Sequence, residues 1–280
     1  MDWSWAGPPL DVRPLFPLER AAFVAVLEDL TAEDWQRPTV CPGWRVHDVA
    51  AHVVHDYLRK LSGHRDRQPA PGPGPGEDLP RFLHRVNQEF VEVASRWSPR
   101  VLTDLLRHLG PQLDQFWASL DMDRLGEAVS WATPGVPAPA WLDVAREYTE
   151  YWVHQQQVRD AVSRPGASGE RLVTPVIDTF VRAVPYALRH LAPAPGSRVQ
   201  LEVTGRGGGT WTIRRQQVTW VVDRGGPSTQ DAAAVVWLSA DTLWRVATRS
   251  ITVETARERA TIAGDQDLGS AVLTLVAIIR

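Results

Sequence analysis

The feature that most constrains the fold is a change in hydrophobic periodicity near residue 192. Before this point, apolar residues recur at intervals of three and four over several long segments, which is the pattern of amphipathic helices. After it, short runs such as 199–203 alternate with a period of two, which is typical of β-strands. A Pro- and Gly-rich stretch at 192–197 separates the two patterns. The sequence therefore predicts an α+β protein, with a helical bundle over 1–192 and a small α+β domain over 193–280.

Helical periodicity, caps and breaks predict the individual elements. In the first region, helices are expected over 18–30, 46–63, 79–97, 99–120, 140–162 and 172–191. Ser98 and Pro99 provide an N-cap and a first-turn proline, and the Pro- and Gly-rich stretch 68–76 is expected to be a long loop inside the bundle. In the second region, strands are expected over 199–203, 211–213, 218–222 and 234–238, helices over 241–248 and 265–278, and an extended segment over 260–263.

Charge and cysteine content exclude several classes of protein. The formal net charge of −3 shows no excess of basic residues of the kind that nucleic-acid-binding proteins carry. Cys41 is the only cysteine, which excludes an intrachain disulfide and a Cys-rich zinc site, so His, Glu or Asp would have to hold any metal ion. No apolar run approaches the ~20 residues that span a bilayer, and the first residues do not resemble a signal peptide. We therefore expect a cytoplasmic protein.

Glu150 and His154 are the pair with the clearest chemical potential. They lie four residues apart in the predicted helix 140–162, so their side chains share one face and can point at one ion. The alternative is an ordinary helical pair in which Glu150 accepts a hydrogen bond from His154 on a solvated surface.

His52 is a second candidate ligand, on the predicted helix 46–63. It stands beside the apolar stripe of that helix, whereas His47 is expected to lie further toward solvent. His55 and Asp56 follow at i+3 and i+4 and could orient the His52 ring, because a metal-bound imidazole usually donates its other N–H to a neighbouring acceptor. They could equally be a surface pair. The alternative is a boundary histidine that binds nothing.

Other motifs favour structural roles. The run Gly205-Arg-Gly-Gly-Gly209 lacks the spacing of a P-loop and is better explained as a hairpin turn. Cys41 has no neighbouring base in its own turn, so a small apolar residue is the better interpretation than a nucleophile. No Ser/His/Asp arrangement can be recognised by spacing, and the 13 tryptophans fall mostly on helical stripes and strand faces.

One signature resembles that of a known family. The run Thr39-Val-Cys-Pro-Gly-Trp-Arg-Val-His-Asp-Val-Ala-Ala-His52, preceded by Trp35 and followed far along the chain by Glu150-x-x-x-His154, closely resembles the mycothiol-dependent maleylpyruvate isomerase family. This family is a branch of the DinB-like metalloenzymes and is common in actinobacteria. The C-terminal segment resembles the family's small α+β domain, so the resemblance covers nearly the whole chain.

The resemblance implies a fold, a site and a chemistry. The fold would be a DinB-like helical bundle followed by a small α+β domain. His52, Glu150 and His154 would bind a divalent metal ion, usually zinc, and mycothiol would be the cosubstrate. Two imidazoles and one carboxylate leave an open position on such an ion, where a low-molecular-weight thiol becomes a thiolate that attacks a small electrophile. The family also implies a C-terminal arginine that holds an anionic substrate.

Arg249 is the counterpart of that arginine, although Thr248 stands where the family pattern has glycine. Arg245 and Arg257 remain alternatives, and each of the three could instead be a solvated surface arginine.

Three classes of function follow from this site. The leading one is a metal-dependent, mycothiol-using cis–trans isomerase of maleylpyruvate type or a thiol S-transferase. The second is a hydrolase that activates water at the same ion. The third is a non-catalytic protein that binds a small ligand. The expected partners are a small-molecule electrophile and a thiol, without nucleic acid or membrane, and the helices could support a homodimer.

Overall fold

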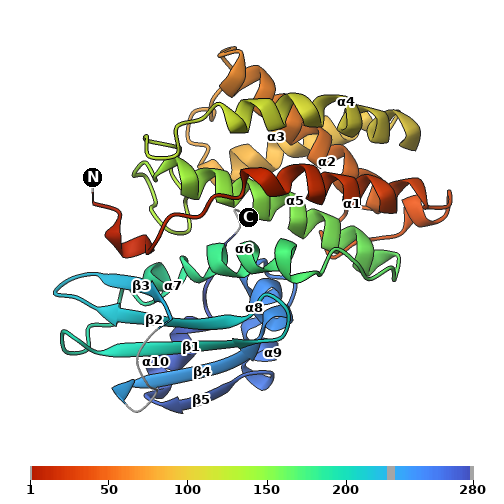
Figure 1. Ribbon diagram of the computed structural model, residues 1–280. Helices are drawn as coiled ribbons and strands as arrows, with labels where there is room; N and C mark the ends of the chain where they lie inside the picture. The colour runs from red at the N-terminus through yellow and green to blue at the C-terminus, as the bar shows by residue number, and fades with distance from the viewer. Residues whose placement is uncertain (1, 226–230, 278–280) are drawn as a thin grey trace. The chain divides into compact units, whose positions relative to one another are not determined.

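The chain folds into two compact units. A computed structural model describes residues 2–225 and 231–277. We call residues 12–120 and 150–167 the helical unit. The rest of the described chain, which holds the strands, we call the sheet unit. Figure 1 labels the elements of both. This division concerns packing, so the domain boundary predicted after residue 192 remains a proposal about parts that fold independently.

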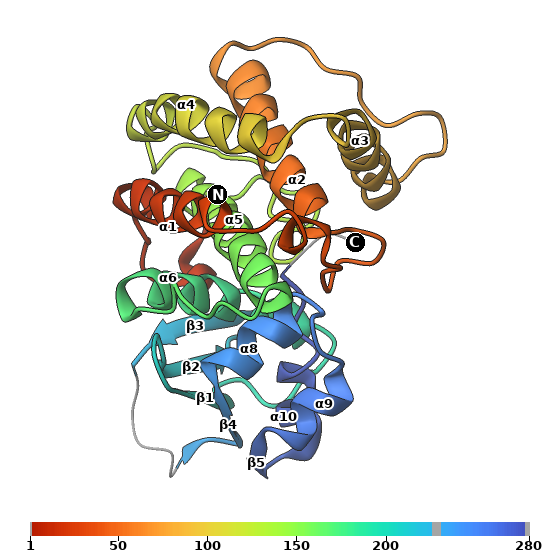
Figure 2. The same ribbon diagram turned by 90° about the vertical axis from the view of Figure 1, so that its right-hand side faces the viewer.

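The helical unit is made of long helices joined by short turns and one long loop. Its elements are α1 (Phe16–Glu28), a 3-10 turn (Asp34–Gln36), α2 (Val46–Arg59), a π-helical turn (Lys60–Arg65), α3 (Leu79–Ala94), α4 (Pro99–Ala118) and residues 150–161 of α5 (Ala140–Ala161). The Pro- and Gly-rich stretch 68–76 lies in the extended connection between α2 and α3, drawn in orange in Figure 2. None of the helices in the described part of the chain is long and apolar enough to cross a lipid bilayer.

Side chains at the helix starts explain where these helices begin. Ser98 accepts a hydrogen bond from the backbone N–H of Val101 and Pro99 follows it, so the predicted start of α4 is confirmed. At the start of α2, the Asp48 carboxylate accepts a hydrogen bond from the backbone N–H of Arg45, which satisfies a donor that the helix itself leaves unpaired.

Aromatic side chains hold α5 against α1 and α2. Phe16 at the start of α1 stacks on Trp117 of α4, with 5.5 Å between ring centroids. Tyr151 of α5 meets Phe16 at 5.8 Å and Tyr57 of α2 at 5.0 Å, in both cases edge to face. All four side chains are almost fully buried. Burial of this much aromatic surface fixes α5 in the core of the helical unit.

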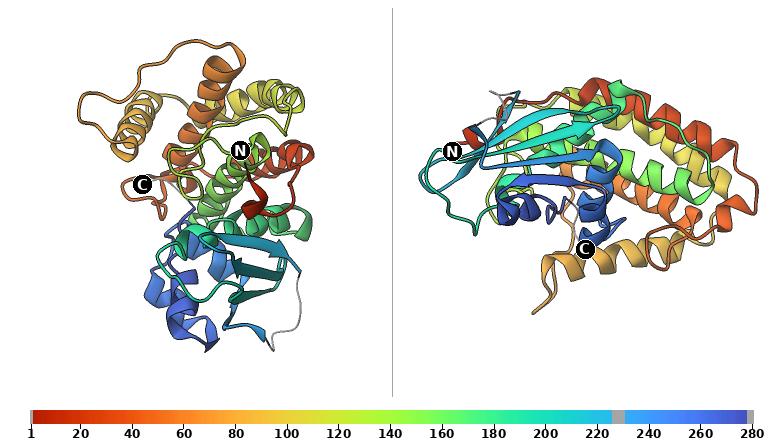
Figure 3. Two further views of the ribbon diagram at one scale, coloured as in Figure 1. Left: turned by 90° about the vertical axis from the view of Figure 1, so that its left-hand side faces the viewer. Right: turned by 90° about the horizontal axis from the view of Figure 1, so that it is seen from below.

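The sheet unit is built around one mixed sheet. Its strands are β1 (Arg198–Thr204), β2 (Gly209–Arg215), β3 (Trp220–Arg224), β4 (Ala234–Ser239) and β5 (Thr261–Gly264), in the order β3-β2-β1-β4-β5. They lie side by side in the view from below in Figure 3. β1 pairs with β4 in parallel, and the other neighbouring strands are antiparallel. The predicted α+β class is confirmed.

Short helices accompany this sheet. They are α6 (Glu170–Val181), α7 (Val184–Ala187), α8 (Ala240–Ala247), α9 (Val253–Glu258) and α10 (Gln266–Val272). Figure 2 shows α8, α9 and α10 gathered near β4 and β5. The buried indole of Trp211 on β2 donates a hydrogen bond to the Asp178 carboxylate of α6 at 2.7 Å, which ties α6 to the sheet. The glycine-rich run after β1 forms the expected hairpin, in which a side chain at Gly208 would clash with the carbonyl oxygen of Val203.

Three local expectations differ from the structure. The single helix predicted over 172–191 is two helices, and Pro185 lies in the first turn of the second. α9 is present where no helix was predicted. His47 is buried, not turned toward solvent, and its Nε2 atom lies 3.0 Å from the backbone oxygen of Trp97. The helix predicted over 265–278 corresponds to α10, which ends at Val272, and residue 278 lies outside the described residues.

Candidate metal centre

Glu150 and His154 face each other across one turn of α5. The Nε2 atom of His154 lies 3.1 Å from Oε1 of Glu150. The i,i+4 spacing stacks the two side chains on one helix face, as the sequence predicted. His154 is only 9% exposed, whereas the Glu150 side chain is 36% exposed, so the pair lies at the border between the core and the surface.

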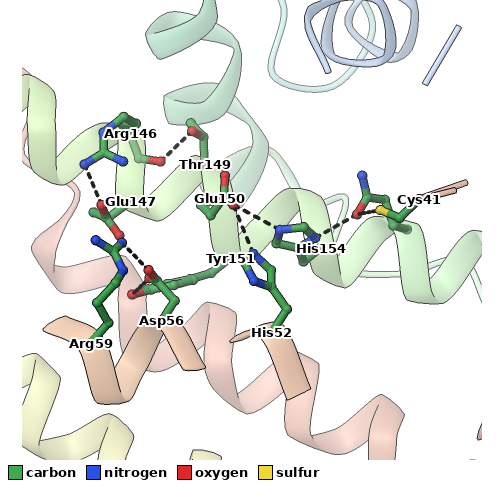
Figure 4. Close-up of polar contacts among 11 residues, drawn as sticks. Cys41, His52, Asp56, Arg59, Arg146, Glu147, Thr149, Glu150, Tyr151 and His154 are labelled. Carbon is green, nitrogen blue, oxygen red and sulfur yellow. Dashed lines mark hydrogen bonds and ion pairs between the residues drawn. The ribbon is translucent and has the colours of Figure 1, made fainter. Parts of the chain in front are cut away.

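His52 of α2 brings a third donor to the same place. Its Nε2 atom lies 3.5 Å from the same oxygen of Glu150, although the two residues are 98 positions apart in the chain. The rings of His52 and His154 meet edge to face, with 4.7 Å between their centroids. One donor atom from each of His52, Glu150 and His154 lies within 4.8 Å of the others (Figure 4). The folding of α2 against α5 thus creates the cluster.

The geometry of this cluster fits a zinc ion. Zinc bonds of about 2.0–2.1 Å at tetrahedral angles place neighbouring ligand atoms about 3.3 Å apart. The two nitrogen-to-oxygen distances in the cluster, 3.1 and 3.5 Å, bracket that value. Two imidazoles and one carboxylate are also the donor set of zinc sites that keep an open position for a ligand. Two of the three distances between ligand atoms therefore suit such an ion, and the third, between the histidine nitrogens, lies within 4.8 Å.

Burial and hydrogen bonding give the three groups different protonation states. Burial lowers the pKa of His52, which favours a neutral ring. Burial also opposes the ionised form of Glu150, but its hydrogen bonds with His154 and His52 outweigh this and hold its pKa well below the usual value. For His154, burial is outweighed by its neighbours Cys41 and Glu150, which raise its pKa well above the usual value. These shifts favour a carboxylate at Glu150 and a protonated ring at His154 when no ion is bound.

Gln157 and Cys41 complete the surroundings of His154. The amide oxygen of Gln157, one turn after His154 on α5, lies 2.8 Å from Nδ1 of the His154 ring. The same oxygen accepts a hydrogen bond from the thiol of Cys41 at 3.2 Å. The turn that contains Cys41 shows no base in the sequence, because His154, which approaches Cys41, comes from α5. Gln157 was missed as well, although its i+3 spacing from His154 was a usable signal.

The signature loop before α2 is held by its own hydrogen bonds. The Thr39 hydroxyl donates to the backbone oxygen of Trp44 and accepts from the backbone N–H of Cys41. Gly43 has a φ of 80°, a conformation that residues with a side chain adopt rarely. As a result, Cys41 is presented toward Gln157, and the Trp44 ring lies 5.2 Å from the ring of His52. The loop therefore contacts the surroundings of both histidines.

The partners predicted for His52 are engaged elsewhere. The Asp56 carboxylate accepts a hydrogen bond from Tyr151 at 2.8 Å and pairs with Arg59 (Figure 4). His55 stacks on Phe90, with 4.5 Å between centroids. The Nδ1 atom of His52 is buried without a hydrogen-bond partner among the described residues. The orienting roles suggested for His55 and Asp56 are therefore wrong in this structure, because neither side chain bonds to the His52 ring.

Arg249 lies in the sheet unit, directly after α8. Its side chain is exposed, and its guanidinium forms no hydrogen bond or ion pair with the described residues. The two alternatives are engaged: Arg245 pairs with Asp241, and Arg257 donates to Ser270.

The backbone at Arg249 is unusual, with a φ of 54°. The backbone N–H of Arg249 donates to the backbone oxygen of Val246, and the backbone N–H of Ser250 donates to the backbone oxygen of Arg245. This pair of hydrogen bonds is the Schellman arrangement at a helix end. Glycine is the usual residue at this position.

Comparisons with known proteins agree with these features. A comparison of the sequence with curated proteins finds no match. The crystal structure of a mycothiol-dependent maleylpyruvate isomerase matches with a TM-score of 0.52 and 14% sequence identity, over 84% of this chain and 86% of that chain. A mutant of that isomerase matches with the same values. At this identity the likeness shows a common fold.

The family model gives the stronger result. The model of the mycothiol maleylpyruvate isomerase N-terminal domain matches residues 16–159, which is just over half of the chain. The matched segment contains His52, Glu150 and His154 together with the helices that carry them. The chain therefore belongs to the mycothiol maleylpyruvate isomerase family.

Proposed function

We propose that this protein is a metal-dependent isomerase that uses mycothiol to convert a small cis-alkene carrying a conjugated carbonyl group into its trans isomer. The observation that carries the proposal is the convergence of His52, Glu150 and His154 from two distant helices. Family membership supports the thiol-dependent isomerase chemistry. Maleylpyruvate is the first substrate to test, because it appears in the names of the family and of the crystallised protein.

His52, Glu150 and His154 would hold the ion, for which zinc is the best fit to the donor set. The bound ion would keep the thiol of mycothiol ionised near neutral pH and so supply the nucleophile. Glu150 contributes the negative charge of the site. The rings of His52 and His154 are buried and limit the access of water to their side of the site. With three side chains as ligands, such a site would leave room for the thiol.

The reaction needs no net change in atoms or electrons. The thiolate sulfur forms a bond to one alkene carbon, and the π electrons move onto the conjugated carbonyl oxygen as an enolate. Rotation about the resulting carbon–carbon single bond follows. The enolate electrons then restore the double bond and expel the thiolate. If a proton reaches the enolate carbon before expulsion, the thioether persists and the outcome is S-transfer.

Arg249 is the residue we assign to the carboxylate of the substrate. A planar guanidinium recognises a carboxylate through two parallel hydrogen bonds. Two facts support this role: Arg249 is exposed and unpaired among the described residues, and it occupies a backbone position that favours glycine. A strained residue that makes no stabilising contact of its own is a candidate for function.

The test is turnover by purified protein loaded with zinc. Incubation with maleylpyruvate and mycothiol is expected to give fumarylpyruvate, detected by absorbance, with mycothiol recovered unchanged. Accumulation of a thioether would identify an S-transferase. Turnover without thiol would identify a hydrolase and overturn the proposal. Protein that takes up no zinc would favour a binding protein and remove both enzymes.

A further inference from the structure

We propose that Gln157 is a positioning residue of the metal centre, and that its uncharged amide makes the centre selective for an anionic sulfur ligand. This inference rests on the proposed function, because it concerns the same ion and the same thiol. It goes beyond the ligand set, since Gln157 is not one of the three residues that would hold the ion.

The tautomer of His154 is the first part of the argument. When Nε2 of His154 gives its lone pair to an ion, the ring proton must sit on Nδ1, so Nδ1 becomes a donor. The acceptor it meets is the amide oxygen of Gln157 at 2.8 Å. A metal-bound imidazole is commonly oriented by such an acceptor. Gln157 is 6% exposed, so water does not readily replace it.

The orientation of the amide itself is the second part. An amide can present either oxygen or nitrogen, and only oxygen suits a donating Nδ1. The Cys41 thiol lies 3.2 Å from the same oxygen and donates to it. Two donors, one from α5 and one from the signature loop, therefore select the oxygen. This gives Cys41 a role that requires no reactivity of its sulfur.

The charge of the site is the third part. A divalent ion, one carboxylate and two neutral imidazoles carry a single net positive charge, which a thiolate neutralises. A carboxylate in place of the Gln157 amide would remove that positive charge before the thiol arrived. The amide therefore orients His154 as a carboxylate would, while it leaves the centre able to attract an anion.

Neighbouring carboxylates do not change this balance. Asp56 pairs with Arg59 and lies near Lys60. Glu19, which also lies near His154, has Arg20 and Arg159 beside it. Asp56 thus has a basic partner and Glu19 has Arg159 nearby, whereas a carboxylate at position 157 would add a negative charge directly beside His154.

Two substitutions separate orientation from charge. Gln157→Leu keeps the approximate size of the side chain and removes the acceptor, so the Kd for Zn²⁺ is expected to rise about 10–100-fold. Gln157→Glu restores an acceptor, so the Kd for Zn²⁺ is expected to return to the wild-type value or below. In Gln157→Glu, however, mycothiol is expected to bind about tenfold more weakly, because the added negative charge opposes the thiolate. A merely structural role would not produce these opposite effects.

The measurements do not depend on turnover. The Kd for Zn²⁺ is obtained by competition with a chromophoric chelator. Mycothiol binding is followed through the visible spectrum of the Co²⁺-substituted protein, where sulfur coordination adds an intense charge-transfer band. Gln156→Leu is the matched control, because the Gln156 side chain is buried on the same helix and donates to the oxygen of Gly166. It is expected to lower stability and leave the Kd for Zn²⁺ unchanged.

The outcomes distinguish this inference from the proposed function. If the wild-type protein binds neither Zn²⁺ nor Co²⁺, the metal centre is wrong and the role of Gln157 falls with it. If the wild-type protein binds both ions but Gln157→Leu binds Zn²⁺ equally tightly, only the positioning role is overturned. If Gln157→Glu binds mycothiol as tightly as the wild type does, the charge argument is overturned.

Discussion

The rings of His52 and His154 meet edge to face with 4.7 Å between their centroids, and both point Nε2 at the same carboxylate oxygen of Glu150. Two imidazoles brought this close in a buried place repel each other when both are protonated, and each is costly to desolvate as a cation. A shared divalent ion would relieve both problems. This relationship gives the predictions below their common basis.

Loss of either imidazole is expected to abolish metal binding. Loss of a hydrogen-bond partner of a metal ligand weakens metal binding about 10–100-fold. His52→Ala and His154→Ala remove a ligand itself, so each should weaken Zn²⁺ binding by more than that. Metal content per chain, measured by elemental analysis, tests this. His47→Gln is the control, because His47 is equally buried on α2 but contacts Trp97. Full metal content in His154→Ala would remove the proposed ligand set.

Metal binding is expected to release about one proton at neutral pH. Burial opposes protonation of His154, but Cys41 and Glu150 raise its pKa well above the usual value, so the ion must displace a proton from its ring. His52, whose pKa is lowered by burial, is already neutral, and Glu150 is already ionised. Affinity for Zn²⁺ should therefore rise with pH. Calorimetry in buffers of different ionisation enthalpy counts the protons, and a count of zero would contradict the assignment.

Glu19→Gln is expected to stabilise the protein at alkaline pH. Burial raises the pKa of Glu19 from 4.5 to about 7, only partly offset by its hydrogen bond with Gln155. The folded protein therefore keeps a proton that the unfolded chain releases between these values. The contribution of Glu19 to stability is greatest below pH 4.5 and is lost as pH rises through 7.

The size of this effect follows from the shift. A difference of roughly 2.5 pKa units corresponds to a gain on the order of 3 kcal/mol for Glu19→Gln at pH 8, and to little gain at pH 4. Urea unfolding of both proteins at the two pH values measures it. A gain that does not change with pH would show that Glu19 is not the titrating group.

Arg249→Gly is expected to increase stability and decrease activity. Glycine removes the strain of a φ of 54° at the end of α8, which should raise the free energy of unfolding by about 1 kcal/mol. Loss of the guanidinium should raise the KM for an anionic substrate about tenfold or more. Thermal unfolding and steady-state kinetics measure the two effects. Arg249→Asn, which also tolerates this backbone conformation, should match the kinetic defect, and an unchanged KM in both variants would exclude the role.

The sequence predicted the local structure of the chain well where the signal is periodic. The helices at 46–63 and 140–162 and the alternating strands were predictable because their apolar residues repeat along one face. α9 was missed because its six residues are too short to show a helical period, and only the Thr252 cap marks it. The parallel pairing of β1 with β4 could not be predicted either, since alternation shows a strand but not its neighbour.

The candidate site divides in the same way. Glu150 and His154 could be paired from their spacing alone, because four residues make one helical turn. The hydrogen-bond partners of the histidines could not be predicted from spacing. Asp56 was suggested as a partner for His52, but Tyr151 and Arg59 bind that carboxylate instead. Which acceptor a side chain meets depends on contacts between helices that lie far apart in the chain.

By itself, then, the sequence determined most of the helices and strands and the two residues that share one face of α5, because these follow from interactions within a few residues. Only the tertiary structure decided that His52 joins them, that Cys41 and His154 share the oxygen of Gln157, and that Glu19 is buried among the helices. These relationships arise from the packing of α1, α2 and the signature loop against α5. The physical reason is that burial and hydrogen-bond partners depend on the three-dimensional surroundings of a side chain, which spacing along the chain does not specify.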